Sequence, residues 1–185
     1  MEESLKQHSS SCIRVVFFGP ESTGKTSLAK GLAEIYQTRW VPEFAREYLE
    51  EKLERTGEIC APQDIWPIAV GQMKLENKAA QQANTFLFCD TNVLTTEVYA
   101  KAYFGGWCDT RLLEANKVNH YDIYFLTDID VPFEEDLLRD RPHQRQEMLA
   151  AFENALNEYK ITYVILKGSH EARILQVTDY LKQYV

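Results

Sequence analysis

The 185-residue sequence has no apolar run long enough to cross a membrane and no excess of basic residues. Twenty basic residues stand against 28 acidic ones, so the formal net charge at pH 7 is −8. A surface that coats nucleic acid needs a basic face, and this balance argues against one. We therefore expect neither a nucleic-acid partner nor a membrane partner. A local basic patch would most naturally serve nucleotide phosphates.

Cysteine pairs are missing as well. The four cysteines are scattered and form no C-x-x-C pair, so we interpret them as reduced thiols of a cytoplasmic protein. Residues 1–12 lack the apolar segment of a signal peptide, and we expect a flexible tail there. No linker rich in Pro, Gly or Ser divides the remainder, so residues 13–185 are expected to form a single domain.

The most informative stretch is residues 19–26, which match the P-loop pattern G-x-x-x-x-G-K-[ST] at every defined position. An apolar run at 13–18 predicts a strand before it, and apolar spacing at 26–36 predicts a helix after it. In this arrangement backbone N–H groups converge on phosphate at a helix N-terminus. We expect ATP as cofactor, bound by Gly19, Glu21, Ser22, Thr23, Gly24, Lys25, Thr26 and Ser27.

Four more apolar strands alternate with helical patterns along the chain. The strands are expected at 38–42, 85–89, 123–126 and 163–166, and the helices between and after them at 44–53, 65–84, 93–103, 109–115, 143–159 and beyond 169. Strands that are apolar throughout are typical of a parallel sheet covered on both faces. The sequence therefore predicts an α/β P-loop NTPase fold, a five-stranded parallel sheet with helices on both faces, nucleoside-kinase-like and with a short lid.

Two carboxylates follow strands at the edge where ligands bind in such sheets. Asp90 is expected to hold Mg²⁺ together with Thr26, or to act in catalysis; the alternative is a residue that only caps a turn or helix. Glu43 is expected to bind or deprotonate the hydroxyl of an acceptor, with Arg46 beside it. The alternative for Glu43 is an acid stabilised by the dipole of the following helix.

Arginines gather in the irregular segment 131–142 and just after it. Arg139, Arg141 and Arg145 look like a lid that brings cations to a transferring phosphoryl group. Neighbouring acidic residues leave a second interpretation open, a solvated run of paired charges. A GTPase is disfavoured because Asn116-Lys117-Val118-Asn119 has Asn where N-K-x-D needs a carboxylate, and because it precedes a strand.

Several segments together resemble one known family. Glu43-Phe44-Ala45-Arg46-Glu47 resembles an E-Y-G-R-E segment, residues 88–96 resemble I-D-T-D followed by T-T, and residues 138–146 resemble an L-R…Q-R-Q lid. In this order after the P-loop, they are similar to the nicotinamide riboside kinase domain of NadR proteins. The resemblance covers residues 13–169. It implies ATP-dependent phosphorylation of the ribosyl 5′-hydroxyl of nicotinamide riboside, with Lys25, Glu43, Asp90, Arg139 and Arg145 as catalytic residues.

The sequence also departs from that family. NadR proteins carry a helix-turn-helix and an adenylyltransferase with H-x-G-H, and neither is expected here. The resemblance places aromatic residues on both sides of the nicotinamide ring, whereas this chain has Pro42 and Leu75 at those positions. We therefore assign acceptor binding to Trp40, Glu43, Arg46 and Asp90. A kinase for another small acceptor, or a non-catalytic ATP-binding switch, remains an alternative, and the oligomeric state is open, a homo-oligomer included.

Overall fold

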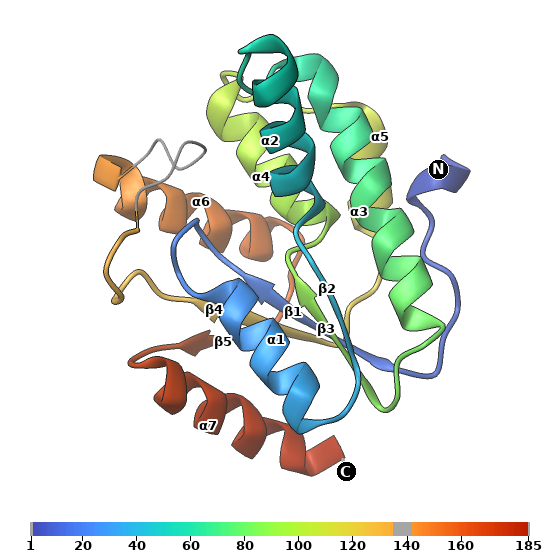
Figure 1. Ribbon diagram of the computed structural model, residues 1–185, viewed down its shortest axis with the longest axis vertical. Helices are drawn as coiled ribbons and strands as arrows, with labels where there is room; N and C mark the ends of the chain where they lie inside the picture. The colour runs from blue at the N-terminus through green and yellow to red at the C-terminus, as the bar shows by residue number, and fades with distance from the viewer. Residues whose placement is uncertain (1, 135–141, 185) are drawn as a thin grey trace.

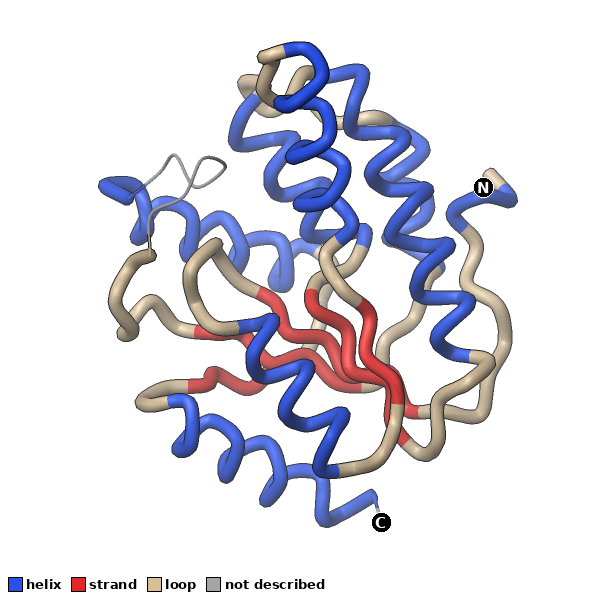
Figure 2. Tube along the Cα trace, in the orientation of Figure 1, coloured by secondary structure: helices blue, strands red, loops and turns tan. Residues whose placement is uncertain are grey.

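The computed structural model describes residues 2–134 and 142–184, and its centre is a five-stranded parallel sheet in the order β2-β3-β1-β4-β5 (Figures 1 and 2). The predicted α/β fold is confirmed. The first strand pairs with both the third and the fourth, so the segment that follows it lies at the middle of the sheet edge. The strands are β1 Ile13–Phe18, β2 Arg39–Val41, β3 Phe86–Asp90, β4 Ile123–Thr127 and β5 Tyr163–Leu166.

Side chains of the central strands are buried on both faces of the sheet. In β1, Val15 and Phe17 belong to one apolar cluster, while Val16 and Phe18 belong to another. This is the two-residue alternation of an extended strand, and both sets are apolar because helices cover both faces. The uninterrupted apolar runs in the sequence have this cause.

The helices form one layer on each side of the sheet and an outer pair. Two of them, α1 Lys25–Ile35 and α7 His170–Leu181, pack together on one face (Figure 1). The opposite face is covered by α3 Ile65–Ala80, α4 Val93–Tyr103 and α6 Arg145–Glu158. Beyond these, α2 Phe44–Thr56 packs on α3, and α5 Thr110–Val118 packs on α4. Short 3-10 turns occur at Glu3–Leu5, Pro62–Asp64, Pro142–Gln144 and Lys182–Tyr184.

Three helices end three or four residues away from their predicted ends, and one of them is α5, which continues to Val118 rather than 115. The second helix continues to Thr56 and ends where Gly57 adopts a left-handed conformation at φ 70°. The long helix α3 stops at Ala80, four residues before the predicted end. Glycine at a helix C-terminus is a recognised stop signal because it lacks the Cβ that disfavours this conformation.

The expected flexible tail is wrong for the described residues 2–12. Leu5 is fully buried among residues of α3, α4 and α5. Two side-chain amides hold the backbone of this segment: Asn119 Nδ2, just after α5, donates to Leu5 O at 2.9 Å, and Asn77 Oδ1 on α3 accepts from His8 N at 2.7 Å. One apolar anchor and these bonds fix a segment whose polar composition suggested fraying.

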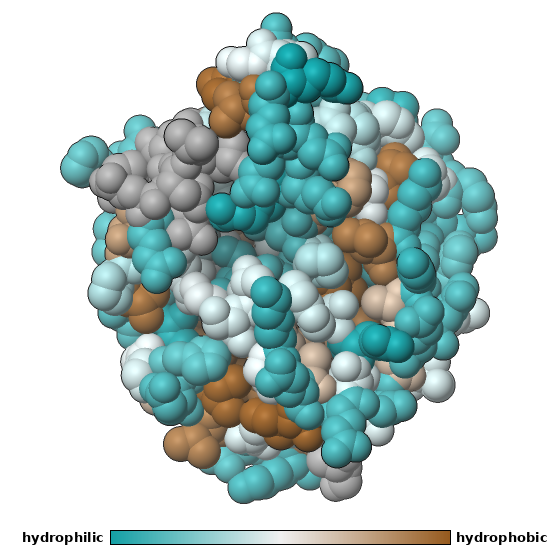
Figure 3. Space-filling view, viewed as in Figure 1, coloured by the Kyte–Doolittle hydropathy of each residue, from teal (hydrophilic) through white to brown (hydrophobic). Residues whose placement is uncertain are grey.

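The visible surface is mostly hydrophilic in Figure 3, with apolar colour confined to separate patches. One patch lies at the bottom of the view, where α1 and α7 are drawn in Figure 1. Within the described part of the chain, every helix is too short or too polar to span a bilayer. The four cysteines form no disulfide.

We predict opposite effects for alanine at two helical glycines. A Cβ on Gly71 of α3 would lie under 3.0 Å from ring atoms of Phe44, whereas one on Gly31 of α1 would meet Ile174 at an ordinary 3.6 Å. Gly71→Ala should lower the free energy of unfolding by ~1–3 kcal/mol through overpacking. Gly31→Ala should leave it unchanged or raise it by up to about 1 kcal/mol, because alanine favours the helix. Urea unfolding of both variants measures this, and equal stabilities would contradict the tight contact of α2 with α3.

Candidate functional site

The P-loop connects β1 to α1 through backbone conformations that side chains rarely adopt. Gly19 has φ 145°, and a Cβ there would lie 2.5 Å from Thr127 Oγ1 and 2.9 Å from Thr127 O. Gly24, the N-cap of α1, has φ 80°, and Ser22 has φ 55°. The two motif glycines therefore have different roles. Gly19 allows the loop to approach β4, and Gly24 allows the turn into the helix.

Polar contacts hold this loop from below. Thr23 Oγ1 donates to Pro20 O at 2.8 Å and lies 2.7 Å from Thr127 Oγ1. Arg173 Nη1 on α7 donates to Thr23 O at 2.7 Å, and other atoms of its guanidinium bond Gly168 O and Asp128 O. Sequence reasoning missed Arg173, because it lies 150 residues from Thr23 and belongs to no motif. Its burial at 2% exposure and its place on the cavity wall show that it braces the P-loop.

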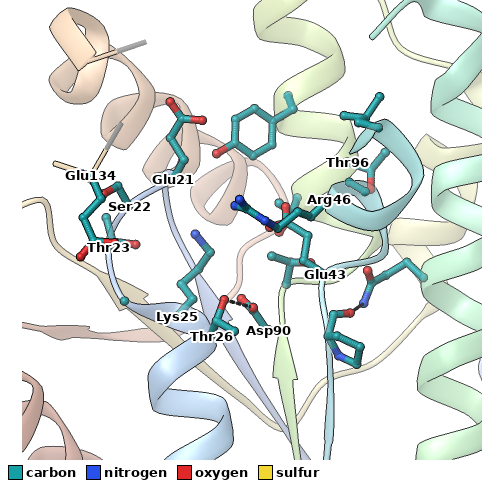
Figure 4. A pocket seen from close by; sticks show the side chains of 18 of the residues that line it. Glu21, Ser22, Thr23, Lys25, Thr26, Glu43, Arg46, Asp90, Thr96 and Glu134 are labelled. Carbon is teal, nitrogen blue, oxygen red and sulfur yellow. Dashed lines mark hydrogen bonds between the residues drawn. The ribbon is translucent and has the colours of Figure 1, made fainter. Parts of the chain in front are cut away.

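A cavity of about 820 Å³ opens above the loop at the carboxyl edge of the sheet (Figure 4). Its lining includes most of the predicted nucleotide-binding residues, from Glu21 through Ser27. Lys25 reaches into it, only 7% exposed, and its Nζ donates to Pro20 O at 2.6 Å. An ammonium held at the start of α1, where the helix dipole also favours anions, is suited to phosphate.

Asp90 and Thr26 meet at the floor of the cavity, where the Thr26 hydroxyl donates to Asp90 Oδ2 (Figure 4). Asp90 is 1% exposed, and its second oxygen, Oδ1, has no hydrogen-bond partner among the described residues. Burial raises the pKa of Asp90, opposed by the charge of Lys25 and the bond from Thr26. The next residue, Thr91, is strained at φ 77°, as backbone at functional sites often is.

These two side chains fit Mg²⁺. An orphaned buried carboxylate oxygen beside a hydroxyl supplies the hard oxygen ligands that this ion takes. In residues 2–134 and 142–184 no group of three or more His, Cys, Asp or Glu could hold a metal by itself. Mg²⁺ commonly uses one or two protein ligands and completes its shell with substrate phosphates and water, so the small donor set suits the ion.

Glu43 stands at the N-cap position of α2, and its side chain makes no capping bond to that helix. It lines the cavity instead, opposite Lys25 in Figure 4. Burial, with the negative charge of Asp90 as the second cause, raises the pKa of Glu43 to about 7, although Lys25 and Arg46 oppose the rise. A carboxylate that faces the cavity and titrates near neutrality suits a general base better than a helix-dipole partner.

One residue predicted to bind the acceptor, Trp40, does not line the cavity. Trp40 lies outside the lining, packed in the cluster around α1 with Lys30 Nζ 5.1 Å from its ring centroid. The side chain at this position of β2 points to the α1 face, and a one-residue step of a strand reverses that direction. Tyr99, Tyr103 and Phe104 of α4 and its C-terminal end supply the aromatic lining instead. Arg46 does line the cavity and forms an ion pair with Glu50 at 3.0 Å.

The predicted lid is only partly described. Arg139 and Arg141 lie outside the described residues. Arg145 begins α6, and its guanidinium donates to Val131 O at 2.8 Å and to Ser22 O at 3.3 Å. It therefore sits against the P-loop backbone, and its contact with a γ-phosphate stays a prediction.

Comparison with known proteins agrees with this arrangement of strand, P-loop and helix. The model of the AAA_28 family, described as an AAA domain, matches residues 14–173. That range includes every predicted site residue.

Individual relatives and solved structures name more specific proteins than the family model does. The chain is 28% identical over 176 residues to the trifunctional NAD biosynthesis/regulator protein NadR of Salmonella typhimurium, covering 91% of this chain but only 42% of that protein. It resembles a crystal structure of NadR protein in complex with NR, with a TM-score of 0.80 and 23% identity over 94% of this chain and 51% of that one. It also resembles deoxyadenosine kinase from M.mycoides, with a TM-score of 0.70 and 12% identity over 92% and 100% of the two chains.

We predict that Glu43→Gln stabilises the protein at high pH. Because its folded pKa is raised from 4.5 to about 7, the folded state binds more protons than the unfolded state in this window. Stability is therefore lost as pH rises from 4.5 to about 7, and glutamine, which cannot ionise, escapes that loss. Since the side chain is partly exposed, we expect a gain on the order of 1 kcal/mol at pH 8, or about 2–4 °C in Tm.

Thermal unfolding at pH 5 and pH 8 measures that gain. Glu47→Gln, an exposed acid in the first turn of the same helix, is the control. A gain of equal size at both pH values would contradict the raised pKa of Glu43.

We also predict that Asp90→Asn removes the benefit of Mg²⁺ for ATP binding. A hydrogen bond or contact to a charged group contributes ~1.5–3 kcal/mol, so affinity for Mg·ATP should fall about tenfold or more. Calorimetric titration of ATP in the presence of Mg²⁺, and again in the presence of a chelator, measures the affinity with and without the metal. Asp179→Asn, an exposed acid on α7, makes the same change in net charge away from the cavity. Unchanged affinity for Mg·ATP in Asp90→Asn would contradict the metal assignment.

Proposed function

Since the chain belongs to the AAA_28 family, whose model covers the whole P-loop site, we propose that it is an ATP-dependent kinase of small nucleoside-type acceptors, most specifically of nicotinamide riboside. The single observation that carries this proposal is the position of Glu43. Its carboxylate, with a pKa of about 7, lines the same cavity as Lys25 and Asp90. A nucleotide-binding switch needs only phosphate and metal contacts, whereas a kinase also needs a base for its acceptor.

The residues of the cavity divide the work of phosphoryl transfer. Lys25 and the backbone N–H groups of the loop bind the β- and γ-phosphates. Thr26 and Asp90 would hold Mg²⁺, which would neutralise charge on the phosphates. Glu43 accepts the proton of the acceptor hydroxyl. The hydroxyl oxygen forms a bond to the γ-phosphorus as the bond to the β-phosphate oxygen breaks, and ADP leaves. Arg145, and Arg139 beyond the described residues, would place cations over the transferring group.

The charges of the cavity favour an acceptor without a phosphate of its own. Glu43, Asp90 and Glu21 bring negative charge to it, and the nearby cation Arg46 is paired with Glu50. An acceptor that carries a positively charged ring would bind more tightly because of these acids. Contact of the ring with aromatic faces would add about 0.5–2 kcal/mol of binding free energy. In place of Trp40 we assign the ring contact to Tyr103 and Phe104, which line the cavity. The pyridinium of nicotinamide riboside has this chemistry.

The relatives support this choice. NadR of Salmonella typhimurium is named for NAD biosynthesis, and a NadR protein with a similar fold was solved with NR, here nicotinamide riboside. The chain spans about two fifths of the length of that curated relative, so only kinase activity is proposed for it. Its four free cysteines are consistent with the reducing cytoplasm, which we propose as its location.

We predict that purified protein with Mg·ATP releases ADP fastest in the presence of nicotinamide riboside. Competition against uridine, cytidine and thymidine ranks the acceptors by kcat/KM. Glu43→Gln should lower turnover ~10²–10⁴-fold, the usual contribution of a general base, while ATP affinity is kept. A kcat/KM for a neutral pyrimidine nucleoside about tenfold higher or more, equal to ~1.4 kcal/mol, would reject nicotinamide riboside as the acceptor. It would still support a nucleoside kinase. If no acceptor accelerates ADP release, the nucleotide-switch alternative is favoured.

A further inference from the structure

The turn between β2 and α2 is held on both sides of Glu43 by one buried amide, that of Gln72 on α3. Gln72 is 2% exposed. Its Nε2 donates to Pro42 O at 3.1 Å, and its Oε1 accepts from Phe44 N at 2.8 Å. These two atoms belong to the peptide groups that directly precede and follow the Cα of Glu43. Holding both peptide planes fixes the backbone torsions of Glu43, and with them the direction of its Cα–Cβ bond.

The carboxylate of Glu43 does not cap α2 and lines the cavity instead. The first N–H groups of a helix lack intrahelical partners, and a polar side chain at the N-cap usually folds back to accept from them. At α2 the N–H of Phe44 is satisfied by Gln72, and the Glu43 side chain makes no capping bond. Gln72 thus satisfies the first N–H of the helix, and the uncapping Glu43 side chain lines the cavity with Lys25 and Asp90.

Packing supports the amide at the neighbouring position. Gly71 precedes Gln72, and the Phe44 ring lies so close to it that a Cβ would collide with the ring. The start of α2 is thus fixed by a ring seated on a glycine and by two hydrogen bonds from the next residue. Both come from α3, whose far side packs under the sheet.

We propose that Gln72 is a positioning residue that aims the Glu43 carboxylate at the acceptor hydroxyl. The inference rests on the proposed kinase function and adds to it the element that holds the base. Charged groups that face Glu43 come from three other places, with Glu21 and Lys25 on the P-loop side, Asp90 on β3 and Arg46 on α2. In this balance of charges a small rotation changes the distance of the base from every one of them, so its direction needs a fixed support.

The chain offers a matched control on the same helix. Asn77 is also a buried amide of α3, 8% exposed, and it also bonds two backbone groups, accepting from His8 N at 2.7 Å and donating to Lys6 O at 2.9 Å. It holds the N-terminal segment rather than the turn that carries Glu43. Asn77→Leu and Gln72→Met each replace an amide with an apolar side chain of similar length, so both lose two buried hydrogen bonds.

The experiment compares kinetics of Gln72→Met and Asn77→Leu in the wild-type protein and in Glu43→Gln. Misplacing a reacting group by about 1 Å can cost ~10²-fold, so Gln72→Met should lower kcat ~10–100-fold with the KM for ATP within about twofold. Asn77→Leu should keep kcat. In the Glu43→Gln background, Gln72→Met should lower kcat further by less than about twofold, because a residue that acts through Glu43 has nothing left to position.

Two results would overturn the inference while leaving the kinase intact. One is equal kcat values for Gln72→Met and Asn77→Leu. The other is a raised acceptor KM at unchanged kcat, which would make Gln72 a direct acceptor ligand. Absence of turnover by the wild-type protein with every acceptor would overturn the proposed function and this inference together.

A measurement without turnover checks the contact itself. Hydrogen exchange of the Phe44 amide should quicken in Gln72→Met and stay slow in Asn77→Leu, since only the former removes its acceptor. Should Gln72→Met fail to fold, Gln72→Asn keeps a neutral amide that is one methylene shorter and cannot bond Pro42 O and Phe44 N together. It should also lower kcat, and wild-type kcat in it would contradict the positioning role.

Discussion

The cavity brings two carboxylates and one ammonium together away from bulk water, and this charge arrangement is the constraint on which the rest of the site depends. Asp90 is almost fully buried, and its charge contributes to the raised pKa of Glu43. Lys25 opposes that rise but is itself bonded to Pro20 O. Buried like charges favour neutralisation or rotation toward solvent. The fold must therefore prevent the side chains from relaxing, and each of them has its own brace.

The braces come from different layers of the fold. Gln72 on α3 holds the turn of Glu43, and the Thr26 hydroxyl holds one oxygen of Asp90. Arg173 on α7, from the opposite face of the sheet, holds the P-loop at Thr23 O. Because both helical layers contribute, the packing of the two apolar clusters is transmitted to the geometry of the site. The strained backbone of Thr91 next to Asp90 indicates that the surroundings define this geometry more strongly than local preference does.

Residues next to regular elements were predictable, and residues that act from a distance were not. Lys25, Asp90 and Glu43 follow strands or open helices, so the apolar pattern that locates the strands also places them at one edge. Gln72 lies within a helix whose sequence pattern predicts only an amphipathic helix. Its bonds to Pro42 and Phe44 depend on the packing of α2 on α3, which the pattern does not show. Trp40 was misplaced because a three-residue strand is too short for alternation to show which face a side chain takes.

The same electrostatics explain why the cavity suits its proposed reactants better than it suits water. In the folded protein without ligands, the unbonded oxygen of Asp90 and the raised pKa of Glu43 each reflect an unfavourable environment for a carboxylate. A divalent cation on Asp90 would relieve the first of these and weaken the main negative charge that acts on Glu43, and an acceptor hydroxyl would give the Glu43 carboxylate a hydrogen-bond donor. Groups that are unfavourable when the cavity is empty thus become favourable as the reactants assemble. Interactions of this kind, stronger in the reacting complex than before it, are the ones that accelerate a chemical step.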